Sequence, residues 1–338
     1  MTTSGQQDLA SRGVIFCDLD VAAAEHPDLV EPHLHRLVPS DRTKFTALHA
    51  AFRTGGTFLS VPPDTAVELP LQTLTWLDAD GSAVFPHTLI VAGDGCELTF
   101  IDRMSSRALD RAFSDAVTEI VVGAGAHVRY VSIQEWGAGV THLGVQRAQV
   151  GRDAEFRSLA IGFGADLARA EAETVLSAPG GFSEMLGVFF AGREQHFDHR
   201  SLQDHVAPNC TSDLLYKGAL KGASRAIYTG TVVIQKGAHL CNAYQTNRNV
   251  LLSETAKAHS VPNHEILSND PVRCGHAASV GPVDEDQLFY LQSRGIPREE
   301  AERLIVFGFF AEVLDRVELE EIRRGLERAI ELELQQES

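Results

Sequence analysis

A regular spacing of turn residues constrains the fold of this chain more than any other feature of its sequence. Turn-type residues that begin a β-type run recur at Gly125, Asp153, Gly181, Asn209 and Gly237, and each lies 28 residues after the one before it. A unit that cannot bury its own apolar face has to stack on copies of itself, so a fixed period favours a solenoid.

Each repeat contains two short runs of β-type residues, for example 127–133 and 145–150, so the coil is built of strands and not of helices. The alternative is a β-sandwich whose strands are evenly spaced, because the run 226–234 is too apolar to show which side chains point inward. We therefore expect a mainly β protein whose core spans residues 55–283, with a β-solenoid preferred to a sandwich.

The first 54 residues form a polar lead-in and a helical segment. Asp41 is a suitable N-cap for a helix that carries Phe45 and Phe52 on one face. His49 shares this face, and we expect it to be half-buried with its polar atoms hydrogen-bonded.

The period changes from 2 to 3.6 in the last part of the chain, residues 284–338. Asp284 can cap a helix over 285–293, and Gly295 is a suitable stop. A second helix, about 298–316, is apolar nearly all round, and a third, about 318–334, has one apolar stripe.

Composition narrows the possible partners and surroundings of the chain. Its 338 residues include 29 Lys and Arg against 46 Asp and Glu, for a net charge of -17, which disfavours nucleic acid and anionic membranes. No apolar run is long enough to span a bilayer, and Met1–Gly13 lacks the order of a signal peptide, so we expect a cytoplasmic protein. The five cysteines contain no Cys-x-x-Cys, which argues against a disulfide framework or a closed zinc site.

The common catalytic motifs are absent: there is no P-loop, no Gly-x-Ser-x-Gly and no His-Glu-x-x-His. Two groups of candidate residues remain. His196, His199 and His205 would be metal ligands if the fold brought them together, and are otherwise polar residues that face solvent around a strand. Cys274 and His276 share a face if their segment is extended. Together they would bind a soft metal or an iron–sulfur unit, or a charged imidazole would lower the pKa of the thiol. The alternative is that both are buried and have a purely structural role.

Several blocks of the sequence resemble one known family. Residues 274–281 (Cys-Gly-His-Ala-Ala-Ser-Val-Gly) and 284–296 (Asp-Glu-Asp-Gln-Leu-Phe-Tyr-Leu-Gln-Ser-Arg-Gly-Ile) are similar to the C-terminal signature of the SufB/SufD family, the scaffold components of the SUF iron–sulfur cluster assembly machinery. Residues 55–62, 67–72 and 217–226 resemble the same family.

This resemblance implies a right-handed parallel β-helix flanked by helical regions, and a non-catalytic scaffold. It also implies a complex with a SufB-like paralogue and the ABC-type ATPase SufC, which would hydrolyse the ATP. In the family the C-terminal helical region docks the ATPase, so the matching contact here comprises Asp284, Gln287, Leu288, Phe289, Tyr290, Arg294, Gly295 and Ile296.

The resemblance also distinguishes the two paralogues. SufB-like members have a stretch that resembles Pro-x-x-Glu-Cys. The matching stretch of this chain, residues 262–266, has Ile266 in the place of the cysteine, and isoleucine cannot bind iron. Residues 274–279 instead resemble the SufD-like pattern Cys-x-His-Gly-Ala-Thr. A SufD-like scaffold implies that His276 faces the partner's cysteine and that a transient iron–sulfur cluster is shared there, with Cys274 as a neighbouring thiol and possible second ligand.

Two departures from the family pattern stand out. Ala277 replaces a glycine, and the chain begins near the block at 13–16, without the helices that precede this block in the family. Other hypotheses remain open: a β-helix enzyme with a metal on His196, His199 and His205, a homodimeric iron–sulfur scaffold that acts without SufB, and a carbohydrate-binding solenoid, which is disfavoured because only 7% of residues are aromatic.

Overall fold

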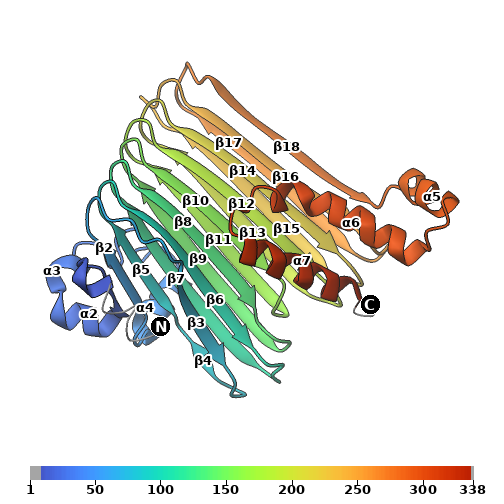
Figure 1. Cartoon of the computed structure of the whole chain (residues 1–338), viewed down its shortest axis with the longest axis horizontal. Coiled ribbons are helices and arrows are strands. Elements are labelled where there is room, and N and C mark those ends of the chain that lie inside the picture. Colours follow the sequence, from blue (N-terminus) through green and yellow to red (C-terminus); the bar gives the residue numbers. More distant parts are fainter. Residues whose placement is uncertain (1–8, 336–338) are drawn as a thin grey trace.

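The computed structural model, which describes residues 9–335, is a parallel β-solenoid of about eight turns with helices at both ends (Figure 1). Two sheets form its walls. Sheet A contains β1 (Ile15–Asp18), β2 (Thr57–Val61), β4 (Ala83–Val84), β5 (His87–Ala92), β7 (Ala112–Val122), β9 (Val140–Val150), β11 (Leu167–Leu176), β13 (His196–His205), β15 (Arg225–Ile234) and β17 (Lys257–Ile266). Sheet B contains β3 (Leu71–Leu77), β6 (Glu97–Ser106), β8 (His127–Glu135), β10 (Glu155–Gly162), β12 (Phe182–Ala191), β14 (Thr211–Leu220), β16 (Asn242–Leu251) and β18 (Arg273–Pro282).

Strands from β5 onward alternate between the two sheets, and each pairs in parallel with the strand one turn later. This arrangement confirms the solenoid and excludes the sandwich. His127 pairs with Glu155, 28 residues on, whereas Arg225 pairs with Lys257, 32 residues on, so the later turns are longer than the sequence period. The expected turn residues have a positive φ except Gly181, where Gly180 takes that conformation.

The space between the two sheets holds both apolar and polar side chains. In its N-terminal half apolar side chains surround the buried Asp102, whose carboxylate accepts hydrogen bonds from the Thr88 and Tyr130 hydroxyls, and the rings of Phe100 and Tyr130 stack at 6.3 Å. In its C-terminal half several buried side chains are polar: His199, Gln203, His205, Ser212 and Gln245. Buried polar side chains are therefore present in both halves of the interior.

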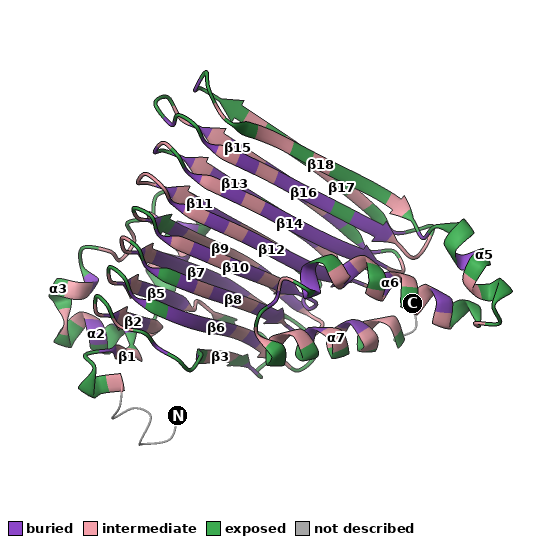
Figure 2. Ribbon diagram, turned by 45° about the horizontal axis from the view of Figure 1, so that its top comes forward, coloured by how far each residue is buried: buried purple, intermediate pink, exposed green. Residues whose placement is uncertain are grey.

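Two helices, α6 (Arg298–Leu314) and α7 (Glu320–Gln335), cover part of the outer face of sheet B, and α5 (Glu285–Ser293) packs against α6 beyond the end of β18 (Figure 1). The Asp284 carboxylate accepts the first N–H groups of α5, which confirms the expected cap. Residues of α6 and α7 form one apolar cluster with sheet B, so strands such as β12 are buried on both faces (Figure 2). The buried Lys217 holds α6 in place, since its ammonium donates to the Phe309 carbonyl at 2.7 Å.

The N-terminal region packs on the outer face of sheet A through α2 (Leu19–Glu25), α3 (Pro27–Val30) and α4 (Lys44–Phe52). The expected cap of α4 was wrong: Thr43, and not Asp41, forms a capping box with Thr46. Of the residues expected on one face of α4, Phe45 and Phe52 are exposed, whereas His49 is fully buried, more than expected, and both of its ring nitrogens have hydrogen-bond partners, as expected.

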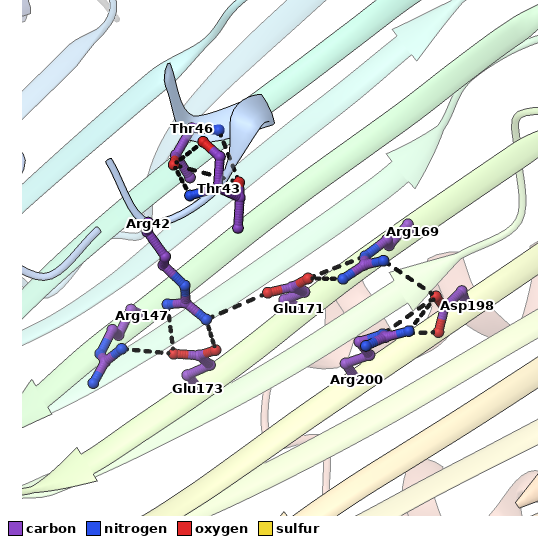
Figure 3. A network of polar contacts seen from close by, with 9 residues as sticks. All are labelled: Arg42, Thr43, Thr46, Arg147, Arg169, Glu171, Glu173, Asp198 and Arg200. Atoms are coloured by element: carbon purple, nitrogen blue, oxygen red, sulfur yellow. Dashed lines mark hydrogen bonds and ion pairs between the residues drawn. The ribbon is translucent and has the colours of Figure 1, made fainter. Parts of the chain in front are cut away.

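An ion-pair network ties the loop before α4 to sheet A (Figure 3). The Arg42 guanidinium binds both oxygens of Glu173 and also reaches Glu171, two carboxylates on β11. Arg147 of β9 pairs with Glu173 at 3.0 Å, and Arg169 pairs with Glu171. Strands β9 and β11 therefore fix a segment more than a hundred residues earlier in the chain.

Candidate functional site

The last turn of the solenoid is open. Strands β17 and β18 end their sheets, and no strand within residues 9–335 pairs with their outer edges. Most of their residues are exposed or half-buried, unlike those of the preceding strands (Figure 2). Large apolar side chains are exposed on or beside them: Val261, Ile266, Leu267, Val272 and Val280. Unpaired edge strands with apolar side chains are surfaces on which a strand of another chain can pair.

His276 on β18 lies beside His264 on β17. His276 Nδ1 is 3.3 Å from His264 Nε2, and the ring centroids are 4.7 Å apart. The position of His276 follows from strand register, because it pairs with Gln245, a buried residue of β16. The two sheets thus bring together, at the open end, imidazoles that are 12 residues apart in sequence.

Cys274 lies one step along the same face of β18. It pairs with Ala243 and is half-buried against the apolar interior. Burial raises the pKa of this thiol, so the expectation that an adjacent charged imidazole lowers it was wrong. Burial, together with the charge on His276, lowers the pKa of His264, which keeps that ring neutral and able to bind a metal ion. Ala277 sits within β18 and is absent from the residues with positive φ, so glycine is not needed there.

The other histidine group does not form a metal site. His196 points to the opposite face of β13 from His199 and His205, because side chains alternate along a strand. His199 and His205 share a face but are six residues apart, about 20 Å along the strand. Both are buried, so the alternative expectation of solvent-facing residues was also wrong for them.

The residues expected to dock an ATPase fall into two groups. Phe289 and Tyr290 on α5 are 74% and 57% exposed, and the Arg294 guanidinium stacks over the Tyr290 ring at 5.2 Å. The remaining five shape or support the helix. Asp284 caps it, Gln287 lines a groove of about 690 Å³ beside α6, Leu288 is buried, Gly295 ends the helix with a positive φ, and Ile296 packs on the helical core.

Sequence reasoning missed two parts of this arrangement. His264 lies in the stretch 262–266, which was compared with the SufB-like pattern only for the cysteine that Ile266 replaces, and Gln245 was not considered. Their positions beside His276 depend on the register between strands in different turns. The alternation of exposed and half-buried residues in β17 does not indicate that register.

No helix among residues 9–335 has the length and apolar character needed to cross a bilayer.

Comparison with known proteins agrees with this architecture. Residues 75–309 match the family described as "SUF system FeS cluster assembly, SufBD core domain", and residues 1–73 match the "SufBD protein N-terminal region". The chain is 36% identical to the iron–sulfur cluster assembly protein SufD of Bacillus subtilis over 329 residues, which cover 96% of this chain and 75% of that protein. It is also 36% identical to an iron–sulfur cluster assembly SufBD family protein of Mycobacterium leprae over 305 residues, 88% of this chain and 76% of the relative. The chain therefore belongs to the SufBD family of the SUF iron–sulfur cluster assembly system.

Proposed function

We propose that this chain is the SufD-like, non-catalytic scaffold of a SUF complex and that its last turn forms one half of a cluster assembly site. A SufB-like paralogue would supply the other half by adding to the open edges of β17 and β18. A nascent iron–sulfur cluster would be held transiently between His276 and the partner's cysteine. The cluster is the cargo of the complex, and this chain alone would not keep it.

The observation that carries the proposal is the contact between His276, which is exposed, and His264, which is half-buried, on unpaired edge strands. Neutral imidazole nitrogens bind iron, and two of them 3.3 Å apart can contribute to one site. The site is incomplete within this chain, because Cys274 is half-buried with a raised pKa and Ile266 has no ligand atom. A partner surface that supplies a thiolate would complete it.

We further propose that α5 contacts the ATPase SufC. Phe289 and Tyr290 expose two aromatic rings beside the cationic Arg294, on a helix at the edge of the molecule (Figure 1). Exposed aromatic and arginine side chains are typical of the strong contacts in protein interfaces. Hydrolysis of ATP would take place in that partner, since the chain has no phosphate-binding loop of its own.

Anaerobic reconstitution with iron and sulfide tests the scaffold role. We expect cluster absorbance to form with the SufB-like partner present and to be weak with this chain alone. His276→Ala and His264→Ala should each lower the cluster yield, whereas His259→Ala, an exposed histidine of the opposite face of β17, should leave it unchanged.

An unchanged yield in His276→Ala, with the complex intact by light scattering, would remove His276 from the proposed site. A full yield with this chain alone would instead favour a homodimeric scaffold that acts without SufB.

A further inference from the structure

A second group of histidines lies under the N-terminal region, several strands away from the open turn. His87 on β5 and Glu119 on β7 point outward from sheet A, and His35, in the loop before α4, covers them. The ligand atoms of these three residues all lie within 4.8 Å of one another. No other such group of His, Cys, Asp or Glu occurs within residues 9–335.

Glu119 anchors the covering loop through its backbone. The carboxylate accepts the N–H groups of His35 and Leu37, both at 2.7 Å, and of Val38 at 2.9 Å. The His35 imidazole takes no part in this anchoring. It stands edge-on to the His87 ring, with centroids 5.1 Å apart, on a residue that has the uncommon φ of 57°. The loop therefore positions a half-buried imidazole over two fully buried groups.

The hydrogen bonds of His87 and of its neighbour His49 do not balance when both rings are neutral. His49 Nδ1 lies 2.8 Å from the Asp115 carbonyl oxygen, and His49 Nε2 lies 3.0 Å from His87 Nδ1. His87 Nε2 then lies 3.1 Å from a carboxylate oxygen of Glu119. Each of these three contacts needs a proton, but two neutral imidazoles carry only two.

A third proton would place a positive charge in a buried position. His49 and His87 are both fully buried, where a charged ring loses its hydration. A metal ion between His87 Nε2 and Glu119 satisfies the contact without the third proton.

With the metal ion in place, each of the two remaining contacts has one donor and one acceptor. His87 Nδ1–H donates to His49 Nε2, and His49 Nδ1–H donates to the Asp115 carbonyl. Metal-bound histidines usually have such a hydrogen-bonded support on their second nitrogen.

The geometry also suits an ion. Two ligand atoms about 2.0–2.1 Å from one zinc ion at a tetrahedral angle lie about 3.3 Å apart, close to the 3.1 Å between His87 Nε2 and Glu119. Gly56 helps to keep His87 in place, since any side chain there would collide with the His87 carbonyl oxygen, 2.5 Å from the position of a Cβ.

We propose that His35, His87 and Glu119 bind a divalent transition-metal ion that clamps the N-terminal region onto sheet A. Two imidazoles and a carboxylate suit zinc and ferrous iron, and zinc binds such sites more tightly. Water completes the coordination from the side of His35, where the cluster is half-buried. This site is independent of the cluster assembly site proposed at His276.

Zinc titration of the full chain, stripped with a chelator, tests the proposal. We expect one zinc ion per chain by elemental analysis, a higher melting temperature with zinc, and an X-ray absorption spectrum with nitrogen and oxygen ligands but no sulfur. His35→Asn should weaken zinc binding by at least about tenfold, because even a supporting residue contributes about 10–100-fold. Asparagine tolerates the positive φ and keeps the backbone N–H that Glu119 binds, so the variant should fold.

The matched control is His259→Asn, which alters an exposed histidine of β17 that belongs to neither proposed site and should bind zinc as the unaltered chain does. His276→Asn shows whether any zinc is held in the last turn. Three results would overturn the proposal: no zinc binding, in which case a third proton occupies the contact; unchanged affinity in His35→Asn; or zinc that is lost in His276→Asn or has a sulfur ligand, which would place it in the last turn.

Discussion

A buried histidine, His142, should make the stability of this protein depend on pH. His142 is fully buried within sheet A, and its Nδ1 lies 3.1 Å from the Ser114 hydroxyl. Burial lowers its pKa to about 4, below the value of 6.5 that it has in the unfolded chain. The unfolded chain therefore binds more protons between these values, and stability is lost as the pH falls from 6.5 toward 4.

We expect His142→Gln to flatten this loss. Relative to the unaltered chain, the free energy of unfolding should fall less steeply between pH 6.5 and 4, by up to about 1.4 kcal/mol per pH unit. Urea unfolding at a series of pH values measures the slope. Ser114→Ala is the control, since it removes the hydrogen bond without removing a titrating group. Equal slopes in His142→Gln and the unaltered chain would show that His142 does not titrate on unfolding.

At the level of single residues, sequence pattern predicts chemistry only where neighbours in space are also neighbours in sequence. Cys274 and His276 were found because they are two residues apart on one strand. His35, His87 and Glu119 come from a loop and two strands, and nothing in their spacing links them. Only the register of sheet A and the docking of the N-terminal loop bring them together.

Among the helices, local sequence signals predicted the ends of α5 but not the N-cap of α4. The helix α5 begins after Asp284 and ends before Gly295, as expected, because its capping involves only groups within one turn of the helix. For α4, Asp41 and Thr43 are both suitable caps. The choice is made by Arg42, whose ion pairs with Glu173 and Glu171 hold the preceding segment against β11.

The cap of α4 can be tested directly. Thr43→Ala removes the hydroxyl that accepts the Thr46 N–H, and we expect it to lower the free energy of unfolding by about 1 kcal/mol. Asp41→Ala, the change that the sequence alone would single out, should alter it by less than about 0.5 kcal/mol. Chemical denaturation measures both. A larger loss in Asp41→Ala than in Thr43→Ala would contradict the observed cap.

The helix α5 carries the proposed contact with the ATPase. Phe289→Ala and Tyr290→Ala should each weaken binding of SufC about tenfold or more, because exposed aromatic side chains at an interface centre often contribute over 1 kcal/mol. Leu332→Ala on α7 is a matched control, since that side chain is 61% exposed on another helix. Calorimetry measures the affinities. If the α5 variants bind normally while Leu332→Ala does not, the contact lies on α7.

For the whole molecule, a repeat of about 28 residues favoured the solenoid over a sandwich, because every turn of a solenoid must bury its apolar residues against the next. The same logic explains why the ends were harder to interpret. At the N-terminal end, helices and the antiparallel strand β1 cover the first turns. At the other end, the sequences of β17 and β18 resemble those of the other strands. Their exposure becomes evident only from the structure, which shows that no further turn within the described part of the chain covers them.

The open end should determine how the chain assembles. Val280→Lys on β18 and Val261→Lys on β17 place a charge where a partner strand would cover it, and burying an unpaired charge costs several kcal/mol. We expect each variant to weaken association with the SufB-like partner by at least about tenfold. Leu74→Lys is the control, because Leu74 is 58% exposed on β3, at the opposite edge of sheet B. Sedimentation or light scattering of the mixed chains measures the complex. Loss of association in Leu74→Lys, with none in the other two variants, would move the interface to β3 and leave His276 outside it.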